Sequence, residues 1–516
     1  MIQMSRVKDS HNTLNIRQYL PLIILFFSSL IIILVTSKNS PLFYINDWVD
    51  LNAFLTMGKG WNHGLIPYRD LFEQKGPILY VIFAIASKIS STYFGVYILE
   101  VINLTIISYL YFKIGTMFFD ERKSYVFVFA SYIILFMTPY FKMGGSAEEF
   151  GWLSIVYGIY LIFLLQKNDF KISKRHYFFS GVMMSYLFWI KYTTIGMWIG
   201  FFMALAIIFG IKKEFKELGI SLALGALGFF AVTLPILIYF KVNGALDDLY
   251  FAYFYSNMNL YPNNLELSAF ARVFNSLFIF VKHMFLSPYL FMLFIVGFLF
   301  LIFSKKILKN NFSLFLYASS YVVLILTVLY GGKDWSYYYL IIFPFGSIPL
   351  LVLVDKIKKT TILQIVLSFL ICMITMIGAN QNIRDSKLFP NNPSLSTEGK
   401  DFKPAQKIFA SIIKKEKNPT LLNYGTLDVG LYHAADILPI NHYFMRQNIP
   451  EDLLPEMMDE QNKIVDEKKV DFIVTASRRE LGDKTIPDNI KKNYKLVAEH
   501  SQDFEGDRTY RLYKKK

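Results

Sequence analysis

Cysteine and charged residues are both scarce in this chain of 516 residues. Its single cysteine, Cys372, excludes a disulfide within the chain and any cysteine-rich zinc or iron–sulfur site. Charged residues make up 18% of the chain and hydrophobic residues 54%, whereas soluble proteins contain about a quarter charged residues. A mean hydropathy of +0.38 over this length is rare in a soluble protein, so we expect an integral membrane protein.

The chain also lacks an internal repeat, which argues against a secondary transporter built from two related halves. Ionisable residues are nearly absent from the centres of the apolar runs, where a transporter or a lipid flippase would need them. The formal net charge of +14 is expected from the cytoplasmic loops of a membrane protein. We therefore do not infer binding to nucleic acid.

Apolar runs long enough to cross a hydrocarbon core of about 30 Å recur along the first 380 residues. Lys191 divides one of them, 176–210, into two short helices. The others lie near residues 20–37, 97–117, 124–141, 150–166, 219–241, 288–304, 312–330, 336–354 and 361–379. The sequence thus predicts an all-α polytopic membrane protein with about eleven transmembrane helices and additional interfacial helices.

The basic clusters set the orientation, because short cytoplasmic loops carry an excess of Lys and Arg. These clusters fall on one side only if the short run 77–89 lies in the outer interface as a helix that does not cross. We therefore expect a plasma-membrane protein with a cytoplasmic N-terminus (1–19) and a transmembrane domain (20–379). Its predicted outer loops are 38–93, 142–149 and 242–282.

After residue 379 the apolar runs shorten and charges of both signs mix. This change predicts an extracytoplasmic α/β domain over residues 380–516. Helices are expected at 404–415 and 455–468, and strands at 421–424, 471–475, 495–499 and 509–513.

The first outer loop, 38–93, is unusually rich in charged and aromatic residues. It contains Asp47, Asp50, Tyr68, Arg69, Asp70, Glu73 and Lys75. Singly, each can be explained as a helix cap or a solvated salt-bridge partner. Because loops of this length are uncommon without a function, the whole series favours a functional site.

Three parts of this loop, Asp47, Pro67–Asp70 and Lys75–Pro77, resemble the GT-C superfamily of polytopic glycosyltransferases. They are similar to the protein O-mannosyltransferase and lipid A aminoarabinose transferase type, glycosyltransferase family 39. The resemblance covers roughly residues 20–380 and implies a polyprenyl-phosphate sugar donor. It implies that Asp47 is the catalytic base and that Lys75 lies beside the donor phosphate.

Two departures from the family pattern leave alternatives open. Asn46 precedes Asp47 where many relatives have Asp-Glu, so Asp50 is a second candidate for the base. Glu148 and Glu149 stand where an Asp is common in the second outer loop. Adjacent helical residues point about 100° apart, so at most one of them should face the first loop, and we favour Glu148 slightly.

Sugar transfer to a hydroxyl needs a base, whereas a phosphate leaves as a stable anion without a general acid. The phosphate needs positive charge, for which Lys75 and Arg69 are the first candidates. Lys191 and Lys333 resemble family positions near the lipid phosphate. Direct displacement predicts inversion at the anomeric carbon. Tyr68, Asp70, Glu73, Glu148 and Glu149 are the candidate substrate-binding residues.

The expected partners are the lipid donor, membrane lipid and an acceptor. Abundant Lys, Asn, Ile and Phe are compatible with an AT-rich bacterial genome. Wall polysaccharide, teichoic acid, a lipid-linked glycan and protein hydroxyls are all open as acceptors, and we rank a bacterial envelope glycan first. No residue spacing is metal-specific, so no metal is required, although a divalent ion is left open. The alternatives are an envelope polysaccharide polymerase or ligase, a lipid-linked sugar flippase, and a non-enzymatic assembly protein.

Overall fold

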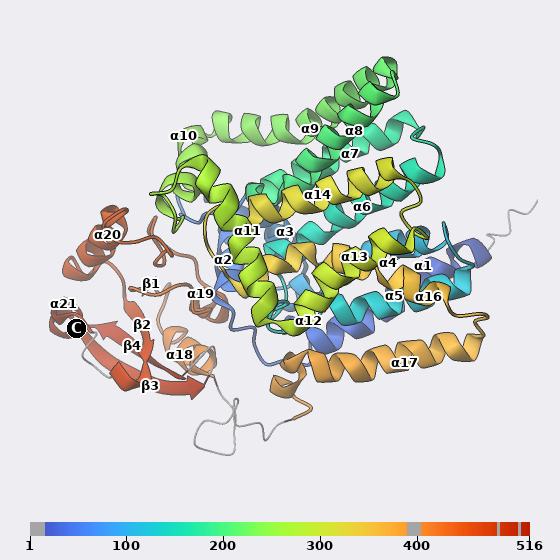
Figure 1. The fold of residues 1–516 in the computed structure, drawn as a ribbon. Coiled ribbons are helices and arrows are strands. Elements are labelled where there is room, and N and C mark those ends of the chain that lie inside the picture. The colour runs from blue at the N-terminus through green and yellow to red at the C-terminus, as the bar shows by residue number, and fades with distance from the viewer. Residues whose placement is uncertain (1–15, 390–403, 482–485, 504–506) are drawn as a thin grey trace, which may run out of the picture.

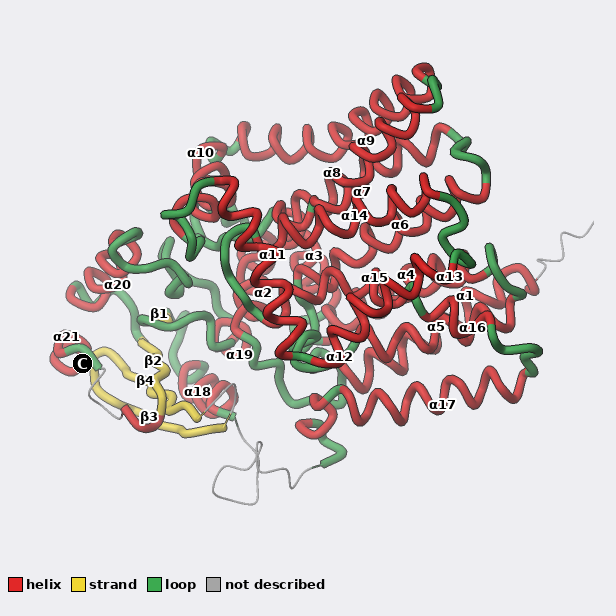
Figure 2. Tube along the Cα trace, in the orientation of Figure 1, coloured by secondary structure: helices red, strands yellow, loops and turns green. Residues whose placement is uncertain are grey.

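The computed structural model describes residues 16–389, 404–481, 486–503 and 507–516. A bundle of long helices forms one part of the molecule, and a small sheet with its own helices packs at one end of it (Figure 1). Figure 2 shows that the strands are confined to that second part.

The helical part comprises α1 (Ile16–Thr36), α2 (Val49–Asn62), α3 (Pro77–Ile89), α4 (Phe94–Gly115), α5 (Glu121–Leu135), α6 (Ala147–Lys167), α7 (Lys174–Ile190), η1 (Tyr192–Thr194), α8 (Gly196–Ile211), α9 (Phe215–Val242), α10 (Leu246–Leu249), η2 (Tyr250–Leu260), α11 (Ala269–Leu286), α12 (Pro288–Leu290), η3 (Phe291–Val296), α13 (Gly297–Ser304), α14 (Asn311–Leu329), η4 (Ser336–Ile342), α15 (Phe343–Ser347), α16 (Leu350–Asp355), α17 (Ile362–Ala379) and η5 (Gln381–Asp385). Of the η elements, η2 and η3 are π-helices and the others are 3-10 helices.

Nine helical segments within the described ranges are long and apolar enough to cross a membrane. This finding supports the predicted multi-pass membrane protein, while the predicted number of about eleven crossings stays a prediction. The counts differ partly because α5 has 15 residues and α7 has 17. At a rise of 1.5 Å per residue these helices span only about 22 Å and about 25 Å.

Residues 242–282, predicted as an outer loop, are largely helical and end within α11. Figure 1 shows α11 running across the long helices of the bundle. Its exposed Phe270, Phe274 and Phe278 recur every fourth residue, whereas Phe280 and Met284 are buried. The sequence pattern misses this helix because Arg272, Asn275 and Lys282 interrupt its apolar run, although α11 is one of the nine segments long and apolar enough to cross a membrane.

Helix α3 has the same one-sided character. Pro77 at its first position fixes the helical φ angle where the missing N–H costs nothing. Val81, Ile85 and Ile89 form an exposed stripe, while Tyr80 and other residues of the opposite face are buried. The helix has the predicted bounds, and its position in the outer interface stays a prediction.

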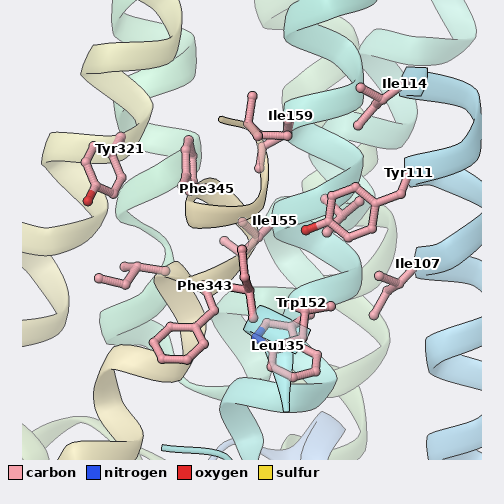
Figure 3. Close-up of a cluster of buried hydrophobic side chains, with 14 of the residues drawn as sticks. Ile107, Tyr111, Ile114, Leu135, Trp152, Ile155, Ile159, Tyr321, Phe343 and Phe345 are labelled. Atoms are coloured by element: carbon pink, nitrogen blue, oxygen red, sulfur yellow. The ribbon is translucent and has the colours of Figure 1, made fainter. Parts of the chain in front are cut away.

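Buried side chains from α4, α5, α6, α14 and α15 meet in one cluster (Figure 3). Two of its polar groups find partners inside the protein: the Trp152 indole donates to the Leu340 carbonyl at 2.7 Å, and the Tyr111 hydroxyl donates to the Pro344 carbonyl at 3.3 Å. Such pairing is required where no water is available. It holds η4 against α6, and these two elements carry residues of the site described below.

The second part comprises α18 (Ala405–Ile413), β1 (Leu421–Asn423), α19 (Leu431–Ala435), α20 (Pro455–Asp466), β2 (Phe472–Arg478), α21 (Asp488–Asn493), β3 (Tyr494–Asp503) and β4 (Asp507–Lys515). The strand order is β1-β2-β4-β3, with β1 parallel to β2 and the other pairs antiparallel. All the predicted strands and helices of this region are present within a few residues of their predicted positions. The division at residue 379 and the extracytoplasmic location stay predictions.

Candidate active site

The loop between α2 and α3 is held in shape by its own side chains. Tyr68 has a left-handed backbone, with φ of 70°, and its hydroxyl donates to the Lys75 carbonyl at 2.6 Å. The Asp70 carboxylate accepts the backbone N–H of Ile66 at 2.6 Å. Tyr68 and Asp70, predicted to bind substrate, therefore make contacts that shape the loop carrying Lys75.

Glu73 fixes Lys75 through both backbone and side chain. One carboxylate oxygen accepts the Lys75 backbone N–H at 2.8 Å and the Tyr80 hydroxyl, and the other lies 3.6 Å from the Lys75 Nζ. Burial opposes the charge on Lys75, but Glu73 and Asp50 outweigh this effect and raise the pKa of Lys75. Lys75 is therefore a firmly protonated cation at neutral pH.

Gly76 brings this turn against the end of α7. Its N–H donates to the Ile190 carbonyl at 3.0 Å, and a Cβ at this position would collide with the Trp189 carbonyl. Only glycine permits this close approach. The consequence is that Lys75 lies near Lys191, the residue that follows α7.

Lys191 interrupts the helical run, as its charge predicts, with an extended backbone of φ −158° and ψ 100°. Its Nζ lies 2.6 Å from a Glu148 oxygen and 3.4 Å from the centroid of the Tyr338 ring. Glu148 and Lys191 are both buried. A buried charge is costly unless it is paired, and each of these residues compensates the other.

Lys75, Lys191 and Lys333 line one pocket. The remaining lining residues are Gln74, Tyr192, Thr193, Tyr253, Asn257, Tyr261, Pro262, Val328, Gly331 and Tyr338. This lining, taken from the described residues, contains three lysines and no acidic residue. Tyr253 and Tyr261, from the segment predicted as the third outer loop, belong to it. The pocket is suited to an anionic group flanked by aromatic rings.

Asp50, on α2, lies close to this pocket. Tyr337 lies beside its carboxylate and favours the charged form. Burial raises the pKa of Asp50, and neighbouring Lys75 only partly offsets that rise. Asp50 is thus part of the acidic group, with Glu73 and Glu148, near Lys75 and Lys191.

Asp47 lies in a different environment, next to Lys38. The Lys38 Nζ is 3.5 Å from Asp47 Oδ1 and 2.7 Å from Asp385 Oδ2. Burial lowers the pKa of Lys38, but the two carboxylates outweigh burial and raise it. Sequence reasoning missed Lys38, although its position directly after the first apolar run, nine residues before Asp47, offered a signal. The sequence offered no comparable signal for Asp385.

Glu148 and Glu149 point in different directions, as their helical spacing predicts. Glu149 accepts the Gly145 N–H at 2.7 Å and neighbours Glu100. Glu100, also missed by sequence reasoning, accepts the Ser37 hydroxyl at 2.8 Å. Glu148 alone of the two pairs with a lysine of the pocket.

Arg69 departs from its expected place. Its guanidinium is partly exposed, lies 2.9 Å from Asp70 and donates to the Asn243 carbonyl at 2.8 Å. It is absent from the pocket lining, where Lys333 supplies the third cation. Among the residues that the structure describes, no group of three His, Cys, Asp or Glu side chains could hold a metal ion.

Fold and site together define a class, a multi-pass helical membrane protein with charged residues gathered where a small α/β domain meets the bundle. No protein-family model and no curated protein sequence matches the chain. The structure is similar to ArnT from Cupriavidus metallidurans bound to undecaprenyl phosphate, with a TM-score of 0.59 and 9% identity over 97% of this chain and 98% of that one.

The same protein in the apo state gives a TM-score of 0.58 and 11% identity over 96% of this chain and 97% of that one. The chain therefore has the fold of the GT-C superfamily, to which ArnT belongs. The oligosaccharyltransferase of Archaeoglobus fulgidus in complex with Zn and sulfate gives a TM-score of 0.47 and 12% identity over 95% and 72% of the two chains. That similarity is too low to argue for a metal here.

Proposed function

We propose that the chain is an inverting glycosyltransferase, with a hexose or pentose bound to a polyprenyl phosphate as its donor. The observation that carries this proposal is the pocket with three lysines and no acidic residue among its described lining. An acceptor hydroxyl on the outer side of the membrane, in a bacterial envelope glycan, would receive the sugar. The likeness in fold to ArnT, solved with undecaprenyl phosphate bound, supports a lipid phosphate as the pocket's ligand.

Lys75, Lys191 and Lys333 would neutralise the phosphate as it leaves. A cation held in place before reaction stabilises developing negative charge at little cost of reorganisation, and Glu73 holds Lys75 in this way. The phosphate could also replace Glu148 as the partner of Lys191, because both are anions. Binding and release of the lipid would then be an exchange of partners at one buried lysine.

Asp47 would be the base. In a direct displacement the acceptor oxygen attacks from the side opposite the leaving phosphate, so the base belongs away from the phosphate-binding lysines. Asp50 is near Lys75, where a carboxylate would repel the donor phosphate, whereas Asp47 is paired with Lys38. We assign Asp50 to orienting Lys75 and the Asp47 carboxylate to accepting the acceptor's proton.

The test is a sugar and linkage analysis of the envelope from a strain that lacks the protein. Complementation with the wild type should restore one sugar substituent, Asp47→Asn should not restore it, and Asp50→Asn should restore it in part. Equal amounts of each variant in the membrane serve as the control. Full restoration by Asp47→Asn would reject Asp47 as the base, and an envelope unchanged by the deletion would reject an envelope glycan as the acceptor.

A further inference from the structure

The small α/β part of the chain holds the loop that leads to Lys75. The Phe72 backbone N–H donates to the His442 carbonyl at 2.9 Å, and the Gln447 side-chain amide donates to the Phe72 carbonyl at 3.1 Å. A His442 ring nitrogen lies 3.0 Å from the Arg69 carbonyl. Segment 442–447 therefore holds both backbone polar groups of Phe72.

This contact reaches the pocket through one peptide unit. The Phe72 carbonyl and the Glu73 N–H belong to the same planar peptide, so a bond to that carbonyl restricts where Glu73 can point. Glu73 in turn fixes Lys75 through its backbone N–H and its ammonium group. Gln447 is thus connected to Lys75 through one planar peptide, the Glu73 side chain and its two contacts with Lys75.

Gln447 is itself well anchored. Its backbone N–H contacts the Met457 Sδ at 3.0 Å, and the residue is buried. The Phe72 ring packs beside Tyr443 and His442, with centroids 5.2 Å and 5.5 Å away. A buried amide without a partner is costly, so Gln447 favours one position of the Phe72 carbonyl.

The same part of the chain also holds α2, which carries Asp50. The Thr56 hydroxyl donates to Asp428 at 2.6 Å, and Lys59 Nζ lies 2.6 Å from Asp436. The loop that carries Lys75 and the helix that carries Asp50 therefore both contact residues 428–447. A domain that merely covered the site would need no such contacts with the backbone of this loop.

We propose that Gln447 is a positioning residue for Lys75 and so for the donor phosphate. It acts through the Phe72 carbonyl and Glu73 and does not touch the lipid. The lipid part of this inference rests on the proposed function, whereas the coupling between Gln447 and the loop does not.

Gln447→Met tests this proposal, because it keeps a side chain of similar length and removes the amide donor. The matched control is Gln406→Met, since Gln406 is also buried and donates to the Val429 carbonyl at 2.9 Å, within the α/β part and outside residues 66–76. The full chain in lipid nanodiscs is compared by hydrogen–deuterium exchange of peptides covering residues 66–76 and by its dissociation constant for undecaprenyl phosphate.

We expect Gln447→Met to raise both the exchange rate of residues 72–76 and the dissociation constant by about fivefold, the worth of one hydrogen bond. Gln406→Met should change neither. Unchanged exchange, unchanged affinity, or equal effects in both variants would overturn the positioning role.

Two controls separate loss of folding and failure of the proposed function from loss of the positioning role. Exchange in β2 and β4 reports whether a variant has folded, and if Gln447→Met unfolds these strands, Gln447→Leu removes the same donor with a shorter apolar side chain. If the wild type itself does not bind undecaprenyl phosphate, the proposed function fails, and with it the lipid part of the inference. The hydrogen–deuterium exchange of residues 72–76 then tests by itself whether Gln447 positions this loop.

Discussion

The two aspartates of the first loop lie only three residues apart, yet their surroundings differ. Asp50 lies beside the lysine pocket with Glu73 and Glu148, whereas Asp47 contacts Lys38, which is shared with Asp385. One region gathers cations that could meet an incoming anion. The other holds a carboxylate beside its own counter-charge. This separation suits a reaction in which the leaving phosphate and the proton acceptor must not compete for the same site.

Asp47→Asn tests this comparison most sharply, because it should have the largest effect on the rate of sugar transfer. Removal of a general base should lower the rate of sugar transfer about a thousandfold, with donor affinity unchanged because Asp47 does not line the pocket. Asp50→Asn should weaken donor binding more than it slows transfer. Steady-state kinetics with a labelled polyprenyl-phosphate sugar measure both, and the reverse pattern would exchange the two roles.

Glu148→Gln should have the next largest effect. It leaves Lys191 buried without its carboxylate, and breaking a buried pair costs about 3–5 kcal/mol, so the melting temperature should fall. Undecaprenyl phosphate should restore more of the melting temperature in this variant than it adds to the wild type. Thermal unfolding with and without the lipid measures this difference.

Glu149→Gln is the matched control, because Glu149 accepts from Gly145 and has no lysine of the pocket as partner. Equal stabilisation of Glu148→Gln and Glu149→Gln by the lipid would mean that the phosphate does not bind Lys191.

A smaller effect is expected from Asp428, where the α/β part meets α2. Burial raises the pKa of Asp428 from 3.8 to about 6. Between these values the folded protein binds more protons than the unfolded chain, so the contribution of Asp428 to stability falls as the pH rises from about 4 to about 6. In Asp428→Asn the melting temperature should depend less steeply on pH over this window, and an unchanged slope would contradict the assignment.

Arg69→Ala should have the smallest effect. Arg69 is partly exposed and paired with its neighbour Asp70, and exposed ion pairs contribute about 0–1 kcal/mol. We expect less than about a fivefold change in donor affinity, measured with the same labelled lipid. A loss as large as that of a pocket lysine would show that Arg69 moves to the phosphate.

Features with strong local signals were predictable from sequence. A short apolar run and the distribution of the basic clusters predicted α3, and a lone charge predicted the break at Lys191. Alternating apolar residues located the strands. The partners of the charged residues were not predictable, since Lys38 meets Asp385 across hundreds of residues and Gln447 meets Phe72 in the same way. Arg69 lies outside the pocket lining, and its role at the phosphate stays a prediction, because sequence spacing does not say which way a loop side chain points.

Binding of undecaprenyl phosphate by the purified chain in nanodiscs is the most direct test of the lysine pocket. Wild type, Lys75→Met, Lys191→Met and the exposed control Lys88→Met would be compared at one salt concentration. We predict saturable binding by the wild type and by Lys88→Met, and affinities at least about tenfold weaker in the two pocket variants. Equal affinity in all four proteins, or no binding by the wild type, would contradict the account.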